Sequence, residues 1–276
     1  MPDTGRENFF GGSMLKKLSI LLVLLLSLGL IIGAAGCGGG GEAEEPEEGA
    51  GEETALVLDV GTDAAYAPFE YKAGSGEIEG FDAELIKAIA DAAGLEMEIK
   101  HVDWDGLFPA LEAGDINAII SAMTITEERQ EVVDFSDPYF EATQIIAVKE
   151  GSEIAGLADL SGKIVGVQMN TTGQYAVEKV EGVKEIKKYP TTPDAIMNLE
   201  NGVVEAVVAD SPVVLNYVQT NPDCGLTSVT DDFEKEYYGI AVKKGNEELL
   251  TKINEGLATV KEDGTYDEIY AKYFGE

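Results

Sequence analysis

A few polar residues lie at the ends of predicted strands and the starts of predicted helices, where proteins usually place their binding and catalytic residues. Asp63 follows an apolar strand and Asp210 precedes Ser211-Pro212, so each offers a carboxylate to a cation. Arg129 carries a planar fork of donors that suits a carboxylate. Thr172 begins a predicted helix, and the free N–H groups of a helix start favour an anion.

Each of these residues also has a purely structural interpretation. Asp63 is typical of a turn, and Asp210 and Thr172 are typical of helix caps. Arg129 lies in Glu127-Glu128-Arg129-Gln130, which by itself indicates a solvent-exposed helix face.

Composition narrows the functional classes. The 276 residues contain 19 Lys+Arg against 52 Asp+Glu, a formal net charge of −33, which excludes a nucleic-acid binder and attracts small cations. His101 is the only histidine, so a multi-histidine metal site is excluded. Two cysteines, Cys37 and Cys224, exclude a disulfide-dense scaffold, and Cys224 is expected as a free thiol that is buried or half-buried. No nucleophile–base pair is visible, and we predict no catalytic residue, no metal and no cofactor.

The body of the chain alternates between strand and helix patterns. Apolar spacing and glycine stops predict strands over 55–60, 95–102, 116–120, 164–167 and 206–209. The same criteria predict helices over 81–93, 104–113, 172–180, 193–201, 212–219, 247–262 and 265–273. This order is typical of an α/β fold with mainly parallel strands.

The N-terminal region has the pattern of an export signal. Lys16 and Lys17 precede an uncharged run over 18–32, shorter than the roughly 20 residues that span a membrane. Ala34-Ala35-Gly36-Cys37 resembles a bacterial lipobox, which implies that Cys37 becomes the lipidated first residue. We expect a signal peptide over 1–37, with Met14 as a candidate natural start, and a disordered acidic tether over 38–53.

A short internal similarity suggests how the body is divided. Residues 145–153 read IIAVKEGSE and residues 239–247 read GIAVKKGNE. Interpreted as two strands that connect two lobes, they predict one lobe from 54–145 plus 240–276 and a second lobe from 146–239. Each would have an ordinary domain size.

Several sequence blocks, in order, resemble the polar amino-acid-binding family (family 3) of ABC-transporter substrate-binding proteins, most closely arginine/lysine/histidine-binding members. The blocks are GTDAAYAPFE (61–70), GFD (80–82), WDGLFPAL (104–111), MTITEER (123–129), VDFSDPY (133–139), GKIVGVQ (162–168), TTG (171–173) and DSP (210–212). The resemblance covers nearly all of 54–276. It implies a periplasmic-binding-protein-like clamp (type II), with two α/β lobes joined by two crossing strands and the ligand between them.

The resemblance also implies how the ends of a free amino acid are bound. Arg129 would bind the α-carboxylate, supported by Thr124 and by the helix start at Thr172, while Ala122 and Asp210 would receive the α-ammonium. The implied ligand-binding residues are Asp63, Tyr66, Glu70, Trp104, Ala122, Met123, Thr124, Arg129, Gln168, Thr171, Thr172 and Asp210.

The side-chain pocket is predicted to favour a cation. Tyr66 and Trp104 match aromatic positions that sandwich the ligand side chain, although Trp104 also fits a core position. Asp63 would pair with a distal positive charge, and Glu70 is a second candidate acid that also fits a solvent-facing position. Where glutamine-selective relatives carry Lys, this chain has neutral Gln168, which does not repel a cation.

The expected function is therefore capture rather than catalysis. The protein would bind arginine first, then lysine or histidine, as a lipid-anchored monomer on the outer face of the cytoplasmic membrane or in the periplasm. Its partners would be an ABC permease and its ATPase, which would recognise the closed form of the clamp. Two alternatives stay open: a binder of glutamine or another polar amino acid, and a dehydratase of cyclic acids on the same fold.

Overall fold

The computed structural model describes residues 57–275, which fall within one compact unit, Glu52–Glu276. The predicted signal peptide, lipidated Cys37 and tether lie outside the described residues. Within them, no helix combines the length and the apolar character needed to cross a membrane. The helices are α1 (Phe81–Ala93), α2 (Leu107–Ala113), α3 (Glu127–Val132), α4 (Thr172–Glu178), α5 (Thr192–Glu200), α6 (Ser211–Thr220), α7 (Glu247–Glu262) and α8 (Thr265–Phe274), with 3-10 turns η1 (Trp104–Gly106) and η2 (Leu157–Leu160).

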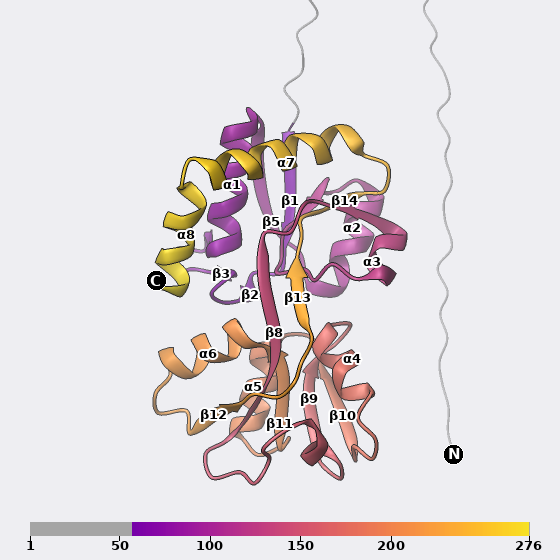
Figure 1. Cartoon of the computed structure of the whole chain (residues 1–276), viewed down its shortest axis with the longest axis vertical. Coiled ribbons are helices and arrows are strands. Elements are labelled where there is room, and N and C mark those ends of the chain that lie inside the picture. Colours follow the sequence, from indigo (N-terminus) through magenta and orange to yellow (C-terminus); the bar gives the residue numbers. More distant parts are fainter. Residues whose placement is uncertain (1–56, 276) are drawn as a thin grey trace, which may run out of the picture. The chain divides into compact units, whose positions relative to one another are not determined.

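The first lobe is built on a mixed sheet in the order β5-β1-β6-β14-β7 (Figure 1). β1 runs parallel to β5 and β6, while β14 is antiparallel to β6 and β7. The bounds are β1 (Val57–Thr62), β5 (Glu96–His101), β6 (Ala118–Ile119), β7 (Val133–Phe135) and β14 (Ala241–Lys243). A small antiparallel sheet adds β2 (Ala65–Tyr66), β3 (Glu70–Lys72) and β4 (Ile78–Glu79).

The second lobe is built on a sheet in the order β10-β9-β11-β8-β12, with β13 paired to β8. β9 is parallel to β10 and β11, whereas β8 is antiparallel to β11, β12 and β13. The bounds are β8 (Phe140–Lys149), β9 (Ile164–Gln168), β10 (Glu185–Tyr189), β11 (Ala206–Asp210), β12 (Leu226–Val229) and β13 (Lys235–Tyr238). The fold is thus the predicted two-lobed α/β clamp.

Two strands cross between the lobes, β8 and β13, which pair side by side in antiparallel fashion (Figure 1). One of them differs from the sequence interpretation. The segment 239–247 does not cross, because its strand β14 lies in the first sheet between β6 and β7. The predicted lobe boundary at 145/146 falls inside β8, and the predicted division into 54–145 plus 240–276 and 146–239 stays a prediction.

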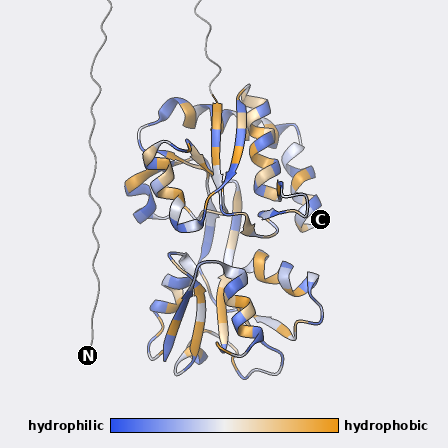
Figure 2. Cartoon of the chain, turned by 180° about the vertical axis from the view of Figure 1, so that it is seen from behind, coloured by the Kyte–Doolittle hydropathy of each residue, from blue (hydrophilic) through white to orange (hydrophobic). Residues whose placement is uncertain are grey.

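Apolar residues cover the inner faces of both sheets and of the helices that pack on them (Figure 2). In the first lobe an aromatic cluster lies where the crossing strands enter. Phe69 packs edge-on against Phe140, with ring centroids 4.9 Å apart, and also contacts Tyr238 and Phe274. The C-terminal helix α8 is therefore attached to the ends of both crossing strands by aromatic packing.

Helix α1 shows how the sequence fixes an element that positions the site. It begins after Gly80, whose φ of 129° and contact with Phe69 leave no room for a side chain, since a Cβ there would lie 2.2 Å from the Phe69 carbonyl oxygen. It ends at Gly94 in the left-handed conformation. These two glycines place the buried Asp82, in the first turn, directly behind the cavity described next.

Candidate functional site

A cavity lies between the two lobes, and residues of both lobes line it. All the predicted ligand-binding residues except Met123 line it. The lining residues are Asp63, Tyr66, Glu70, Trp104, Ser121, Ala122, Thr124, Arg129, Gln144, Gln168, Thr171, Thr172, Thr192, Val208, Ala209 and Asp210. Met123 is fully buried and packs instead in the core around Leu107 and Val133.

Arg129 is the cation of this cavity. It lies on α3 yet is only 8% exposed, so the surface-helix interpretation is wrong. Its Nη1 donates to the Thr124 carbonyl at 2.8 Å and its Nη2 to the Asn170 carbonyl at 3.2 Å. Burial lowers the pKa of Arg129. Among residues 57–275 no carboxylate lies within ion-pair distance of the guanidinium. A buried cation without an anion is costly, so this position favours an anionic guest.

Aromatic rings border the cavity beside Arg129. The Trp104 ring lies 5.3 Å from the Arg129 guanidinium carbon, a cation–π distance. Its Nε1 donates to the Asn170 carbonyl of the other lobe at 3.3 Å, while its ring also packs at the edge of a core cluster. Trp104 therefore lines the cavity and also packs against a core cluster, and its contact with a ligand side chain stays a prediction. Burial, and next the charge of Asp210, raises the pKa of Tyr66, which keeps its hydroxyl neutral.

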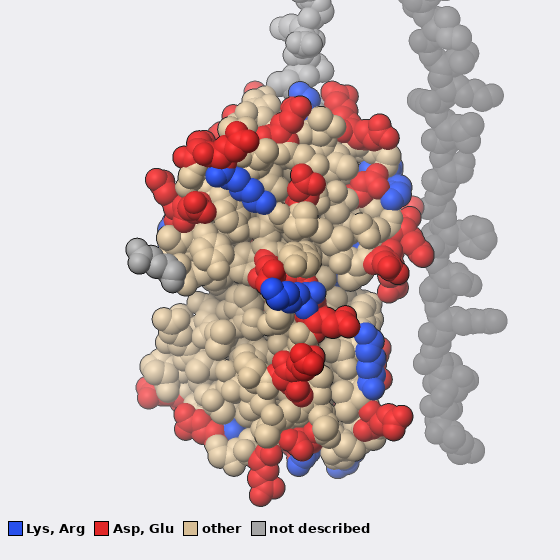
Figure 3. Space-filling model, viewed as in Figure 1, with Lys and Arg blue, Asp and Glu red and all other residues tan. Residues whose placement is uncertain are grey.

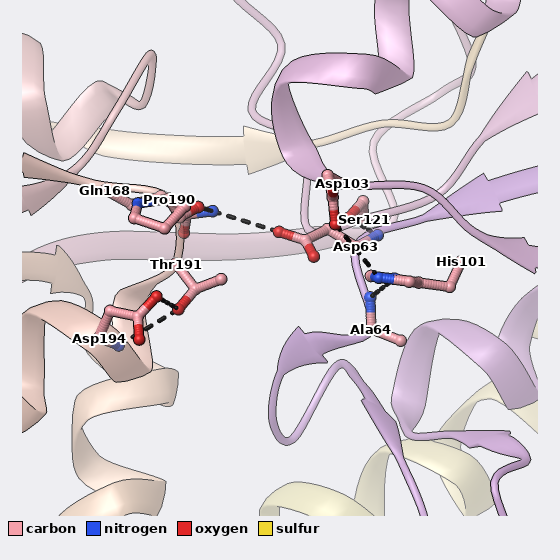
Figure 4. A network of polar contacts seen from close by, with 9 residues as sticks. All are labelled: Asp63, Ala64, His101, Asp103, Ser121, Gln168, Pro190, Thr191 and Asp194. Carbon is pink, nitrogen blue, oxygen red and sulfur yellow. Dashed lines mark hydrogen bonds and ion pairs between the residues drawn. The ribbon is translucent and has the colours of Figure 1, made fainter.

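Asp63 follows β1 and extends toward the second lobe. Its Oδ2 accepts a hydrogen bond from Gln168 Nε2 at 3.2 Å, and Figure 4 shows the two side chains reaching toward each other from opposite lobes. Gln168 is fixed in turn, because its Oε1 accepts from Thr192 Oγ1 at 2.9 Å. Burial raises the pKa of Asp63 to about 6, partly opposed by His101. A carboxylate held out of water in this way gains from a cationic guest.

Glu70, which lines the cavity, and Asp82 form a buried acid pair. Both are 0% exposed, so the solvent-facing interpretation of Glu70 is wrong. Ser121 Oγ donates to Glu70 Oε1 at 2.8 Å, and the Ala122 N–H and the Tyr139 hydroxyl each donate to Asp82 Oδ2 at 2.8 Å. Burial and then the charge of Asp82 raise the pKa of Glu70. Two such acids cannot both ionise easily, so Glu70 is expected to hold a proton.

Asp210 ends β11 and stands at the N-cap position of α6, but its side chain makes no capping hydrogen bond. Its carboxylate instead accepts from the Tyr238 hydroxyl at 2.5 Å and from Gln144 Nε2. Burial, followed by the charge of Glu236, raises the pKa of Asp210 to about 6. Like Asp63, it is an acid that a bound cation would ionise.

The remaining predicted residues lie at backbone turns. Ala122 has a φ of 44°, a conformation uncommon outside glycine, which turns the chain between β6 and Thr124. Thr171, and not Thr172, is the N-cap of α4: its Oγ1 accepts from the Gln174 N–H at 3.3 Å. Thr172 is the first helical residue, and its hydroxyl donates to Glu236 Oε2 at 2.8 Å and accepts from Gln144 Nε2 at 3.2 Å.

Several lining residues were missed by the sequence reasoning: Ser121, Gln144, Thr192, Val208 and Ala209. Gln144 gave a usable signal in the sequence, because a polar amide in the apolar run of β8 must find polar partners once the strand is buried. In the structure it is 4% exposed. Val208 and Ala209 gave none, since an apolar strand end looks the same whether it faces a core or a cavity. In the described part of the chain, no group of acidic, histidine and cysteine side chains could hold a metal ion.

The architecture is that of a two-lobed binding protein with a polar interlobe site. Residues 58–276 match the family described as bacterial extracellular solute-binding proteins, family 3. The chain belongs to this family.

Three similar proteins are named for binding amino acids. A probable histidine-binding protein of Neisseria gonorrhoeae is 44% identical over 224 residues, covering 80% of this chain and 84% of that protein. The structure of the arginine-, lysine-, histidine-binding protein ArtJ from Geobacillus stearothermophilus has 49% identity and a TM-score of 0.77, covering 80% and 96% of the two chains. An ancestral arginine-binding protein bound to glutamine has 51% identity and a TM-score of 0.77, covering 80% and 98%.

Proposed function

We propose that this protein captures a basic amino acid, arginine before lysine or histidine, and delivers it to an ABC importer. The observation that carries the proposal is the charge arrangement of one cavity. Arg129 is buried without an anionic partner among the described residues, and the buried acids Asp63 and Asp210 line the same cavity. This pattern is complementary to a guest with one negative and two positive groups.

Each end of arginine has a matching group in the cavity. The α-carboxylate would pair with the Arg129 fork, and the α-ammonium would donate to Asp210. The aliphatic stem would lie between Tyr66 and Trp104, and the distal guanidinium would reach Asp63. Gln168 would complete this end, since its amide already bonds Asp63 and carries no opposing charge.

Contacts that form only in the closed clamp would stabilise the complex with the amino acid. Direct hydrogen bonds already join the lobes: Asn170 Nδ2 donates to Asp105 Oδ1 at 2.9 Å, and Trp104 Nε1 donates to the Asn170 carbonyl. A guest that contacts both lobes would favour the closed state, because only there are all its partners together. The permease would then recognise the closed clamp, with the protein acting as a monomer held at the membrane by lipidated Cys37.

The test is isothermal titration of the full chain with arginine, lysine, histidine and glutamine. We expect saturable heat for the basic amino acids, with the strongest binding for arginine. Clear binding of glutamine with none of arginine or lysine would refute the basic-ligand proposal in favour of a polar amino-acid binder. Turnover of prephenate or arogenate would refute capture itself in favour of a dehydratase.

A further inference from the structure

Glu236, on the crossing strand β13, accepts hydrogen bonds from side chains of both lobes. Its Oε2 accepts hydrogen bonds from Thr124 Oγ1 and from Thr172 Oγ1, each at 2.8 Å. Its Oε1 accepts from Gln144 Nε2 at 3.2 Å. The residue is half-buried, and neither the cavity lining nor the sequence motifs point to it.

The donors come from different bodies of the clamp. Thr124 belongs to the first lobe, in the segment after β6, and Thr172 begins α4 of the second lobe. Gln144 lies on β8, the other crossing strand (Figure 1). Thr124, Thr172 and Gln144 also line the cavity. A single carboxylate therefore joins both lobes and both crossing strands directly beneath the site.

The neighbours of Glu236 on β13 have other roles. Lys235 is exposed and pairs with Glu141 on β8 at 2.6 Å, on the opposite face of the strand, since successive side chains alternate. The Tyr238 hydroxyl donates to Asp210 at 2.5 Å. Even positions of this strand thus face the site and odd positions face solvent. Figure 3 shows Lys and acidic side chains grouped on the surface where the two lobes meet.

We propose that Glu236 is a positioning residue that stabilises the closed clamp and thereby slows release of the bound amino acid. The inference rests on the function proposed above. When the lobes separate, Thr124 and Thr172 must move apart, so the carboxylate keeps at most one of the two hydroxyls. Hydrogen bonds to an ionised acceptor are stronger than neutral ones, so losing one of them on opening favours closure.

The test compares Glu236→Ala with Glu234→Ala in the full chain. Glu234 is exposed, lies two residues away, and has no hydrogen-bond partner among residues 57–275. For Glu236→Ala we expect arginine to dissociate roughly tenfold faster and to bind roughly tenfold more weakly, with little change in association rate. Small-angle X-ray scattering without amino acid should give a larger radius of gyration, and Glu234→Ala should match the wild type in every measurement.

A double-mutant cycle separates positioning from a general loss of packing. Thr172→Val should weaken binding alone, but the loss in the double variant should be smaller than the sum of the two single losses, because either change removes the same hydrogen bond. Fully additive effects, or a Glu236→Ala protein with wild-type dissociation and radius of gyration, would overturn the proposal. Should Glu236→Ala fail to fold, Glu236→Gln keeps the shape, removes the charge and should change dissociation in the same direction. If the wild type binds no amino acid, the proposed function fails, while the scattering comparison still decides the role of Glu236.

Discussion

Replacing Asp63 by Asn tests the charge that is proposed to select a basic side chain. Asp63 is 4% exposed, and its Oδ2 accepts from Gln168 Nε2 at 3.2 Å. Asn has nearly the same shape, so Asp63→Asn removes the negative charge without opening a cavity. The backbone N–H of residue 63 would still donate to Ser121 Oγ, as it does at 3.0 Å in the wild type.

The expected loss follows from the burial of this carboxylate. A hydrogen bond to a charged group contributes about 1.5–3 kcal/mol, which corresponds to roughly 10- to 150-fold in affinity. Arginine should therefore bind Asp63→Asn weaker by a factor in that range. Glutamine has a neutral side chain that gains nothing from this carboxylate, so its affinity should not fall.

Isothermal titration with arginine and glutamine at pH 7.5 measures both affinities in one protein. Asp59→Asn is the matched control, because Asp59 lies on β1, the strand that Asp63 follows, but pairs with Lys100 at 2.8 Å and does not line the cavity. It should leave both affinities unchanged. Equal losses for arginine and glutamine in Asp63→Asn, or no loss for arginine, would refute the assignment of Asp63 to the distal charge.

Three further predictions address other parts of the structure. Burial raises the pKa of Asp63 and of Asp210 to about 6, and a bound cation favours their ionised forms. Arginine binding should therefore release protons, and the affinity for arginine should fall about tenfold or more between pH 7 and pH 5. Isothermal titration in two buffers of different ionisation enthalpy measures both effects. Arg129→Lys should weaken arginine and glutamine alike by roughly 100-fold in the same titration, because an ammonium replaces a bidentate fork. Gly256→Ala should lower the free energy of unfolding in urea by about 1–3 kcal/mol, since its Cβ would lie 2.5 Å from the Ile89 carbonyl oxygen.

The sequence was most informative where local chemistry sets an element's limits. Helix α1 occupies 81–93 and α7 occupies 247–262, as predicted, because a glycine or a cap residue stands at the ends. The second crossing strand was misplaced, since the apolar run at 239–247 is compatible with either lobe. Only the pairing of β14 with β6 and β7 decides its place, and such pairing is a long-range property.

The site shows the same division between local and long-range information. The family motifs pointed to Asp63, Arg129 and Asp210, and the structure brings these residues into one cavity. Whether a residue in a motif faces that cavity was beyond the sequence, as Met123 shows by packing in the core. Glu236 was missed for a related reason: its three hydrogen-bond donors lie far from it in the chain.

The charges of the cavity imply that selectivity is conditional on pH. With Glu70 protonated, the charged groups are one cation, Arg129, and two acids, Asp63 and Asp210, which arginine would pair completely. Glutamine would pair with Arg129 and Asp210 but would leave Asp63 without a cationic partner. Asp63, with a pKa of about 6, can then take up a proton instead of staying charged. Near pH 7 that proton costs about 1.4 kcal/mol per pH unit above the pKa, and below pH 6 it costs little. The preference for arginine over glutamine should therefore narrow as the pH falls, which a cavity that selected by shape alone would not show.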